Sequence, residues 1–175
     1  LLLHAGNAWL VAHLARQLDA RGPWPLLAAL CFAVHPATIG PAMWLSDRFD
    51  LLATGFVLLA LSSCISACRG AASRGPTLLF AFLAAGSKES AIVLLPMLAV
   101  LLVFAPGRDR SWRAKFLALV VVAMAPLFAA RLFVVHRVDA ALGAGNPFET
   151  IAHGSLAWLR QFPQAIFGGG TGWPA

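Results

Sequence analysis

The chain has 175 residues, of which 60% are hydrophobic and 11% are charged, and its mean hydropathy is +0.80. A soluble globular domain is about half apolar and about a quarter charged. The composition therefore excludes an ordinary soluble domain and predicts an all-α, polytopic transmembrane helical bundle. The formal net charge is +6, but the basic residues fall in short connections between apolar runs, which gives little support to a nucleic-acid partner.

Apolar runs separated by turns predict about six spans. The runs are 1–18, 25–35, 49–68, 77–87, 89–105 and 114–135, with a third cytoplasmic connection over 106–113. The chain opens on Leu1, inside the first run, so we interpret it as an internal fragment. We assign 1–137 to a transmembrane domain and 138–175 to an extracytoplasmic loop, in which an amphipathic helix or a truncated span is expected.

The basic residues are unevenly distributed among the connections. The connections after the first, third and fifth runs hold eight of them, namely Arg16, Arg21, Arg69, Arg74, Arg108, Arg110, Arg113 and Lys115. By the positive-inside rule these connections face the cytoplasm. The alternate connections are therefore expected to face outward.

Two polar islands interrupt the apolar sequence at the outward connections, over 35–50 and over 87–90. An ionisable side chain costs at least ~2.5–3.5 kcal/mol at the centre of a bilayer, so such residues bind a ligand, form an ion path or pair with each other. The rising runs that lead to the islands, 25–35 and 77–87, reach about 16 Å at 1.5 Å per residue, roughly half the hydrocarbon thickness. We therefore expect both islands to lie below the outer surface and to line one outward-open cavity.

Arg48 and Lys88 are the cations of the two islands. An Arg with a nearby Lys suits a phosphate or pyrophosphate, because Arg bonds it bidentately and Lys adds a point charge. The alternative is internal pairing, of Arg48 with Asp47 or Asp50 and of Lys88 with Glu89. Asp50 also stands where an N-terminal cap of the next helix is expected.

The remaining island residues are predicted to line the cavity. His35 is suited either to bonding a substrate hydroxyl or phosphate or to capping a helix, and Trp44 either to stacking on a sugar or to anchoring the interface. Asp47, Asp50 and Glu89 could hold a divalent cation through oxygen ligands, but the D-x-x-D pattern is a weak signal, and no metal or cofactor is predicted.

Two further groups of residues are predicted to be structural. His4 and Asn7 share a face of the first run, where they are expected to hold helices together. Cys64 and Cys68 share a face of the third run and are interpreted as small packing residues.

Four motifs then occur in an order that resembles a known family. They are LLLHAGNA at 1–8, FAVHP at 32–36, WLSDRFDLL at 44–52 and GSKESA at 86–91. This series, within residues 1–105, resembles the membrane glycosyltransferases of the GT-C superfamily, particularly those similar to protein O-mannosyltransferases and to transmembrane proteins that bear tetratricopeptide repeats.

The resemblance implies a multi-pass protein of the bacterial plasma membrane whose cavity faces the periplasm or exterior. It implies transfer of a sugar from a polyprenyl-phosphate-linked donor, with Arg48 and Lys88 near the donor phosphate and His35, Asp47, Asp50 and Glu89 in the cavity. The catalytic carboxylate of the family is expected upstream of Leu1, and the acceptor is unknown. Where many relatives carry a second His and a Glu after the His-Pro pair, this chain has Thr38 and Gly40.

Two other classes of protein fit the same pattern. A transporter or flippase for a lipid-phosphate or an anionic solute would also need broken helices with charges at depth. A non-catalytic scaffold would need only that the two islands pair with each other.

Overall fold

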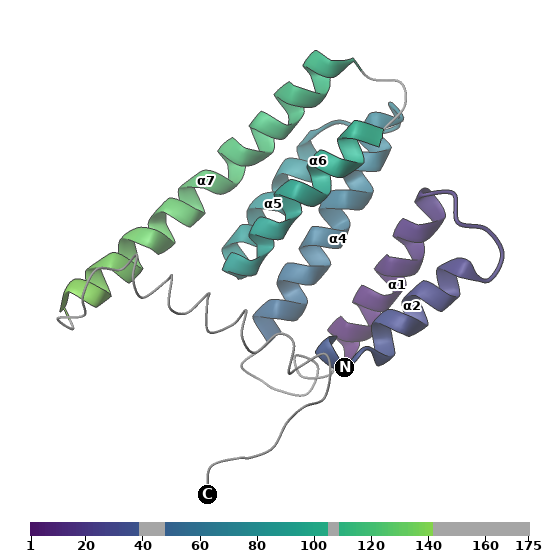
Figure 1. Ribbon diagram of the computed structural model, residues 1–175, viewed down its shortest axis with the longest axis horizontal. Coiled ribbons are helices and arrows are strands. Elements are labelled where there is room, and N and C mark those ends of the chain that lie inside the picture. The colour runs from purple at the N-terminus through teal and green to yellow at the C-terminus, as the bar shows by residue number, and fades with distance from the viewer. Residues whose placement is uncertain (39–47, 105–108, 142–175) are drawn as a thin grey trace, which may run out of the picture. The chain divides into compact units, whose positions relative to one another are not determined.

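A computed structural model describes residues 1–38, 48–104 and 109–141, and these residues are helical with no strand among them (Figure 1). The helices in chain order are α1 (Leu2–Gln17), α2 (Trp24–Val34), α4 (Arg48–Cys68), α5 (Gly75–Ser87), the 3-10 helix η1 (Glu89–Val93), α6 (Leu94–Phe104) and α7 (Arg110–Ala141). The chain divides into two compact units, residues 1–129 and 130–175. The all-α prediction is confirmed over the described residues, and the predictions for Trp44, Asp47 and the tail from 142 fall outside them.

Each of the six apolar runs is helical, but two predicted boundaries are wrong. The run 89–105 is not one helix: it begins as η1 and becomes α-helical at Leu94, with Pro96 in the first turn, where its missing N–H costs no hydrogen bond. The connection 106–113 is not wholly a loop, because α7 begins at Arg110. Asp109 caps it: its Oδ1 accepts a hydrogen bond from the backbone N–H of Trp112 at 3.3 Å.

Helix α4 lies at the centre of the first unit and packs against α1, α5, η1 and α6. The side chains between α4 and α5 are small and almost completely buried: Ala60, Cys64, Ala67, Ala81, Ala84 and Ala85. Small side chains let two helix backbones approach closely. The same core extends to Leu94 and Leu98 of α6 and to Phe116 and Val120 of α7.

Helix α1 is attached to its neighbours by the two polar side chains that were predicted to hold helices together. Asn7 Nδ2 donates a hydrogen bond to the carbonyl of Leu51 in α4 at 2.9 Å, and Asn7 is buried. The Nε2 of His4 lies 3.0 Å from the carbonyl of Ala33 in α2, and its ring stacks on Phe32. The structural role predicted for His4 and Asn7 is confirmed.

Two helices are long and apolar enough to cross a membrane, α4 and the Arg110–Val134 part of α7, with mean hydropathies of 2.1 and 2.4. Helices α2, α5 and the stretch Glu89–Phe104 are apolar but shorter. Helix α2 also exposes a one-sided apolar stripe of Leu26, Leu30 and Val34, four residues apart. An uncovered apolar face of this kind is compatible with membrane association, and the length criterion is met by two of the six predicted spans.

We predict that Gly55→Ala destabilises the protein through Asn7. A Cβ at Gly55 would lie 2.8 Å from Asn7 Oδ1, so the amide must move and weaken its bond to Leu51, a loss of about 1 kcal/mol for a hydrogen bond. Gly6→Ala is the matched control, because a Cβ there meets nothing within 4 Å. The measurement is the unfolding midpoint of the detergent-solubilised protein.

The double variant Asn7→Ala/Gly55→Ala tests whether the contact with Asn7 causes the destabilisation. In an Asn7→Ala background the clash is gone, so Gly55→Ala should raise the unfolding midpoint or leave it unchanged, since Ala is favoured over Gly in a helix by roughly 0.5–1 kcal/mol. An equal loss in both backgrounds would show that the Asn7 contact is not what constrains this position.

Candidate functional site

Among the residues that the structure describes, an ion pair joins the two polar islands. Lys88 Nζ donates a hydrogen bond to Oδ2 of Asp50. The two side chains are 34% and 26% exposed respectively, so the pair is neither fully hydrated nor sealed from solvent. The contact joins one residue of the 35–50 island to one residue of the 87–90 island, as the prediction of a shared site requires.

The internal pairing differs from the one considered from sequence. The predicted alternative paired Lys88 with its neighbour Glu89, and Arg48 with Asp47 or Asp50. The ion pair observed joins Lys88 to Asp50 across two helices, and Asp47 lies outside the described residues. The N-cap prediction for Asp50 is also wrong, because Asp50 lies inside the first turn of α4. A carboxylate in the first turn is still stabilised by the positive end of the helix dipole.

The backbone at Lys88 explains how its side chain reaches α4. Helix α5 ends at Ser87, and Lys88 adopts an extended conformation (φ −156°, ψ 151°) before η1 begins. Its N–H donates to the carbonyl of Ala84 at 3.2 Å, and its own carbonyl accepts from the N–H of Ala91 at 3.2 Å. One extended residue thus interrupts two helices while its backbone groups stay bonded, as at the broken helices of membrane transporters.

Arg48 and Glu89 begin helices at this same end of the bundle. Arg48 is the first residue of α4, is exposed, and forms no ion pair with another residue of the described ranges. Glu89 is the first residue of η1 and is also exposed. Within the residues that the structure describes, no three His, Cys, Asp or Glu side chains come together in a way that could hold a metal ion.

His35 bonds the backbone just beyond α2. It follows the last residue of that helix, and its Nδ1 accepts a hydrogen bond from the backbone N–H of Ala37 at 3.2 Å. This bond satisfies Nδ1 but does not cap the carbonyls at the end of α2, and it places the proton of a neutral ring on Nε2. The side chain is exposed, so Nε2–H is the group with which His35 could meet a ligand.

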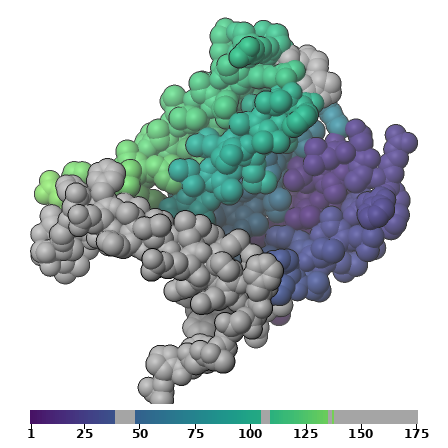
Figure 2. Space-filling view, in the orientation of Figure 1, coloured from purple at the N-terminus to yellow at the C-terminus, as the bar shows by residue number. Residues whose placement is uncertain are grey.

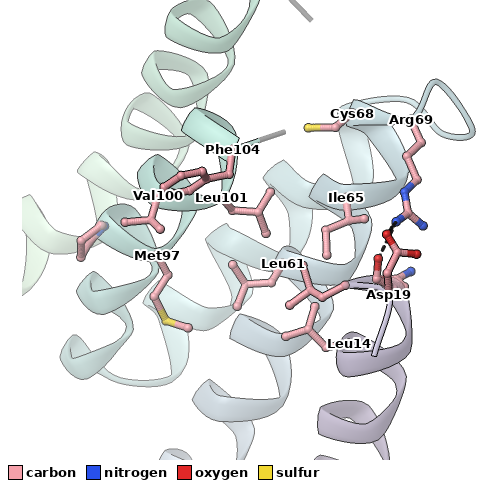
Figure 3. Close-up of a pocket in the computed structure, with 13 residues that line it drawn as sticks. Leu14, Asp19, Leu61, Ile65, Cys68, Arg69, Met97, Val100, Leu101 and Phe104 are labelled. Atoms are coloured by element: carbon pink, nitrogen blue, oxygen red, sulfur yellow. Dashed lines mark hydrogen bonds and ion pairs between the residues drawn. The ribbon is translucent and has the colours of Figure 1, made fainter. Parts of the chain in front are cut away.

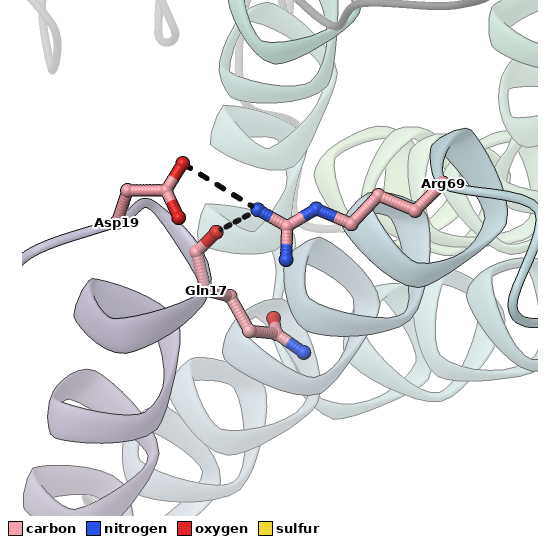
Figure 4. Close-up of polar contacts among 3 residues, drawn as sticks. All are labelled: Gln17, Asp19 and Arg69. Carbon is pink, nitrogen blue, oxygen red and sulfur yellow. Dashed lines mark hydrogen bonds and ion pairs between the residues drawn. The ribbon is translucent and has the colours of Figure 1, made fainter.

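Arginines at the other end of α4 have structural roles that the sequence analysis missed. Arg69 Nη2 donates to the carbonyl of Gln17, at the end of α1, at 2.5 Å and lies 3.9 Å from Asp19 (Figure 4). Arg113 Nη1 likewise donates to the carbonyl of Val103, near the end of α6, at 2.9 Å. Each cation meets carbonyls that a helix C-terminus leaves without partners. The positions of Arg69 and Arg113 beside predicted helix ends could have indicated this role, but the sequence analysis treated both only as loop charges.

We predict that removing one partner of the Asp50–Lys88 pair costs more than removing both. Lys88→Gln or Asp50→Asn alone removes the ion pair but keeps the other half-buried group, and the expected loss is about 1–3 kcal/mol, between the values for exposed and buried pairs. The double variant should lose less than the sum of the two single variants.

The measurement is again the unfolding midpoint in detergent. Lys115→Gln is the matched control, because Lys115 is exposed near the start of α7, away from the island residues. Strict additivity of the two single losses would contradict the coupling.

Comparisons with models of protein families, with curated proteins and with solved structures found no match to this chain. Evidence on function therefore comes from the residues themselves, and the contact between Asp50 and Lys88 is the strongest of it.

Proposed function

We propose that the chain is the donor-binding part of a membrane glycosyltransferase, which transfers a sugar from a polyprenyl-phosphate-linked donor to an acceptor on the extracytoplasmic face. The observation that carries this proposal is the Asp50–Lys88 ion pair. It brings together two of the four motifs whose order resembles the GT-C superfamily, and it does so two residues from Arg48.

The chemistry at this end of α4 suits a phosphate. Arg48 stands exposed at the N-terminus of α4, where the helix dipole favours an anion and a guanidinium can bind two phosphate oxygens at once. Asp50 holds the ammonium of Lys88 beside that position. An ammonium has three donors, so the bond to Asp50 is compatible with a bond to a phosphate oxygen.

The proposed reaction is an in-line displacement at the anomeric carbon. The acceptor hydroxyl forms the new C–O bond and gives its proton to a carboxylate, which we expect upstream of Leu1. The bond between the anomeric carbon and the phosphate oxygen breaks. Arg48 and Lys88 stabilise the negative charge that develops on the departing polyprenyl phosphate.

The proposal includes a multi-pass arrangement of about six spans in a bacterial plasma membrane. It is supported by the arginines that gather beyond the C-terminal end of α4, where Arg69 and Arg74 lie in the α4–α5 connection and Arg69 bonds the end of α1, next to Arg16 and Arg21. It is also supported by the 13 residues of α5, which reach about 20 Å at 1.5 Å per residue and so end short of a full span. With the arginine-rich end in the cytoplasm, Lys88 would lie on the periplasmic or exterior side, below the membrane surface.

The scaffold alternative is favoured by the same ion pair, because two islands that neutralise each other need no ligand. The transporter alternative is favoured by the extended residue between α5 and η1. Exchanging the two charges, with Lys at position 50 and Asp at position 88, distinguishes the scaffold from the enzyme. A purely structural ion pair tolerates this exchange, whereas a phosphate site loses the cation that it needs at position 88.

We predict that Arg48→Gln and Lys88→Gln each lower sugar transfer by at least about 10²-fold, the usual effect of removing a donor that stabilises a developing anion. The exchange variant Asp50→Lys/Lys88→Asp should recover most of the unfolding midpoint lost in Lys88→Gln while transfer stays abolished. The measurement is transfer from a radiolabelled polyprenyl-phosphate sugar by the intact protein in proteoliposomes, with Lys115→Gln as control.

Two results would count against the enzyme. Near-normal turnover in both the Arg48 and Lys88 variants would remove the phosphate-binding role. Movement of a lipid-phosphate across the vesicle membrane without any sugar transfer would favour the transporter alternative instead.

We predict that the two ends of α4 are reached from opposite sides of the membrane. In a cysteine-free background, Thr38→Cys and Lys88→Cys should react with a membrane-impermeant maleimide added to intact cells, whereas Ser73→Cys, in the connection between α4 and α5, should react only after the cells are opened. Protection of Thr38→Cys and Lys88→Cys in both conditions would mean that these positions face lipid and would overturn the predicted cavity.

A further inference from the structure

An apolar groove runs along α4 near its C-terminal end, between α1 and α6. Its volume is about 660 Å³. Figure 3 shows Leu14 of α1, Leu61 and Ile65 of α4, and Leu101 of α6 around it. One side is open, since Val100 of α6 is 59% exposed, and both walls, α1 in purple and α6 in teal, are visible on the face shown in Figure 2. All of these residues belong to the first compact unit.

One end of the groove is polar. Arg69, Asp19 and Gln17 line it there, while leucine, isoleucine, valine, methionine and phenylalanine line most of the rest. Arg69 Nη2 is held by the carbonyl of Gln17, yet the Arg69 side chain is 49% exposed, which leaves part of its guanidinium facing solvent. Asp19 lies 3.9 Å away and is 83% exposed, so it neutralises Arg69 weakly.

Gln17 also lines this polar end. Its Oε1 has almost no accessible surface and receives no hydrogen bond from any residue in the described ranges, so it does not face the groove. The group that the polar end offers to a phosphate is therefore the Arg69 guanidinium.

The depth of this end matches that of a lipid headgroup. The 21 residues of α4 reach about 31 Å at 1.5 Å per residue, so Arg69, directly after the last of them, would lie at the membrane surface if α4 spans the bilayer. Arg16, in the last turn of α1, and Arg21 and Arg74, in the connections, stand at the same side, and a basic cluster there attracts the anionic lipids of the cytoplasmic leaflet.

We propose that this groove binds an anionic phospholipid of the cytoplasmic leaflet, with an acyl chain between α1 and α6 and the phosphate on Arg69. Leu61 and Arg69 are eight residues apart, about 12 Å of helix, which gives part of an acyl chain a continuous apolar wall. The proposal rests on the membrane insertion included in the proposed function and not on sugar transfer. A lipid of this kind would join α1 to α6, two helices whose ends are otherwise connected through α4.

The experiment measures lipid retention on the intact protein by native mass spectrometry. The protein is released from mixed micelles that contain equal amounts of phosphatidylglycerol and phosphatidylcholine. We expect phosphatidylglycerol to be retained about five- to tenfold over phosphatidylcholine, the size of preference that one interfacial cation supplies. Arg69→Gln should abolish this preference, and Arg69→Lys should keep part of it.

A second variant tests the groove without touching Arg69. Val100→Trp should fill the groove and lower retention of both lipids, whereas Val103→Trp should not, because Val103 is an equally exposed valine of α6 that does not line the groove. Sugar transfer should persist in Val103→Trp, and the Arg48 and Lys88 variants should retain phosphatidylglycerol normally. A failure of the lipid proposal is therefore distinguishable from a failure of the proposed sugar transfer.

Three results would overturn the proposal. Equal retention of the two lipids by the unaltered protein would remove the headgroup selectivity. An unchanged preference in both Arg69→Gln and Val100→Trp would place the lipid elsewhere. Crosslinking of a cysteine at position 100 to another polypeptide segment, in the chain itself or in a second copy, would show that protein and not lipid fills the groove.

Discussion

The rest of the described structure depends on how closely α4 and α5 approach each other. Between them lie alanines and one cysteine, and at Ala60, Cys64 and Ala81 no surface remains exposed. Larger side chains would push the two helices apart, whereas these small ones let the backbones approach closely. Since α4 also packs against α1 and α6, the spacing of this one pair determines where the other helices can stand.

This close packing makes the contact between the two islands possible. Asp50 lies in the first turn of α4 and Lys88 directly follows α5, and an ion pair between them requires that the backbones come close together at that end. Thr77 reinforces the opposite part of the interface, where its buried hydroxyl bonds Ser63 Oγ at 3.1 Å. The polar groups between the helices are thus partnered within the bundle, as a low-dielectric environment demands.

Helix positions could be predicted from the sequence because apolar runs alternate with Gly, Pro and Arg. Each of the two wrong boundaries is explained by one residue. Pro96 favours the first turn of a helix, so α6 begins just before it. Asp109 caps α7 from within a basic segment that was interpreted as a loop. The structural roles of His4 and Asn7 were also predictable from their chemistry. The partner of Lys88 was not, because sequence proximity favoured Glu89 whereas the true neighbour is 38 residues away.

The groove beside Arg69 was hidden from sequence for a different reason. Its walls come from three helices, and the residues that line it look like ordinary core leucines and valines until the packing shows which of them remain uncovered. Arg69 itself was counted as one positive charge among several, and no pattern in the sequence states which carbonyl an arginine will bond. Such contacts between distant segments depend on the fold as a whole.

The two polar contacts of α1 have a consequence for the first island. His4 contacts the last turn of α2 and Asn7 bonds the first turn of α4, so one helix fixes the points at which the chain enters and leaves residues 35–47. Sliding α1 by one turn, about 5.4 Å, would break both contacts together. The distance between His35 and Arg48 is thus set by the spacing of His4 and Asn7 along α1. A substitution at His4 or Asn7 is therefore expected to change the position of His35 relative to Arg48 without altering either residue.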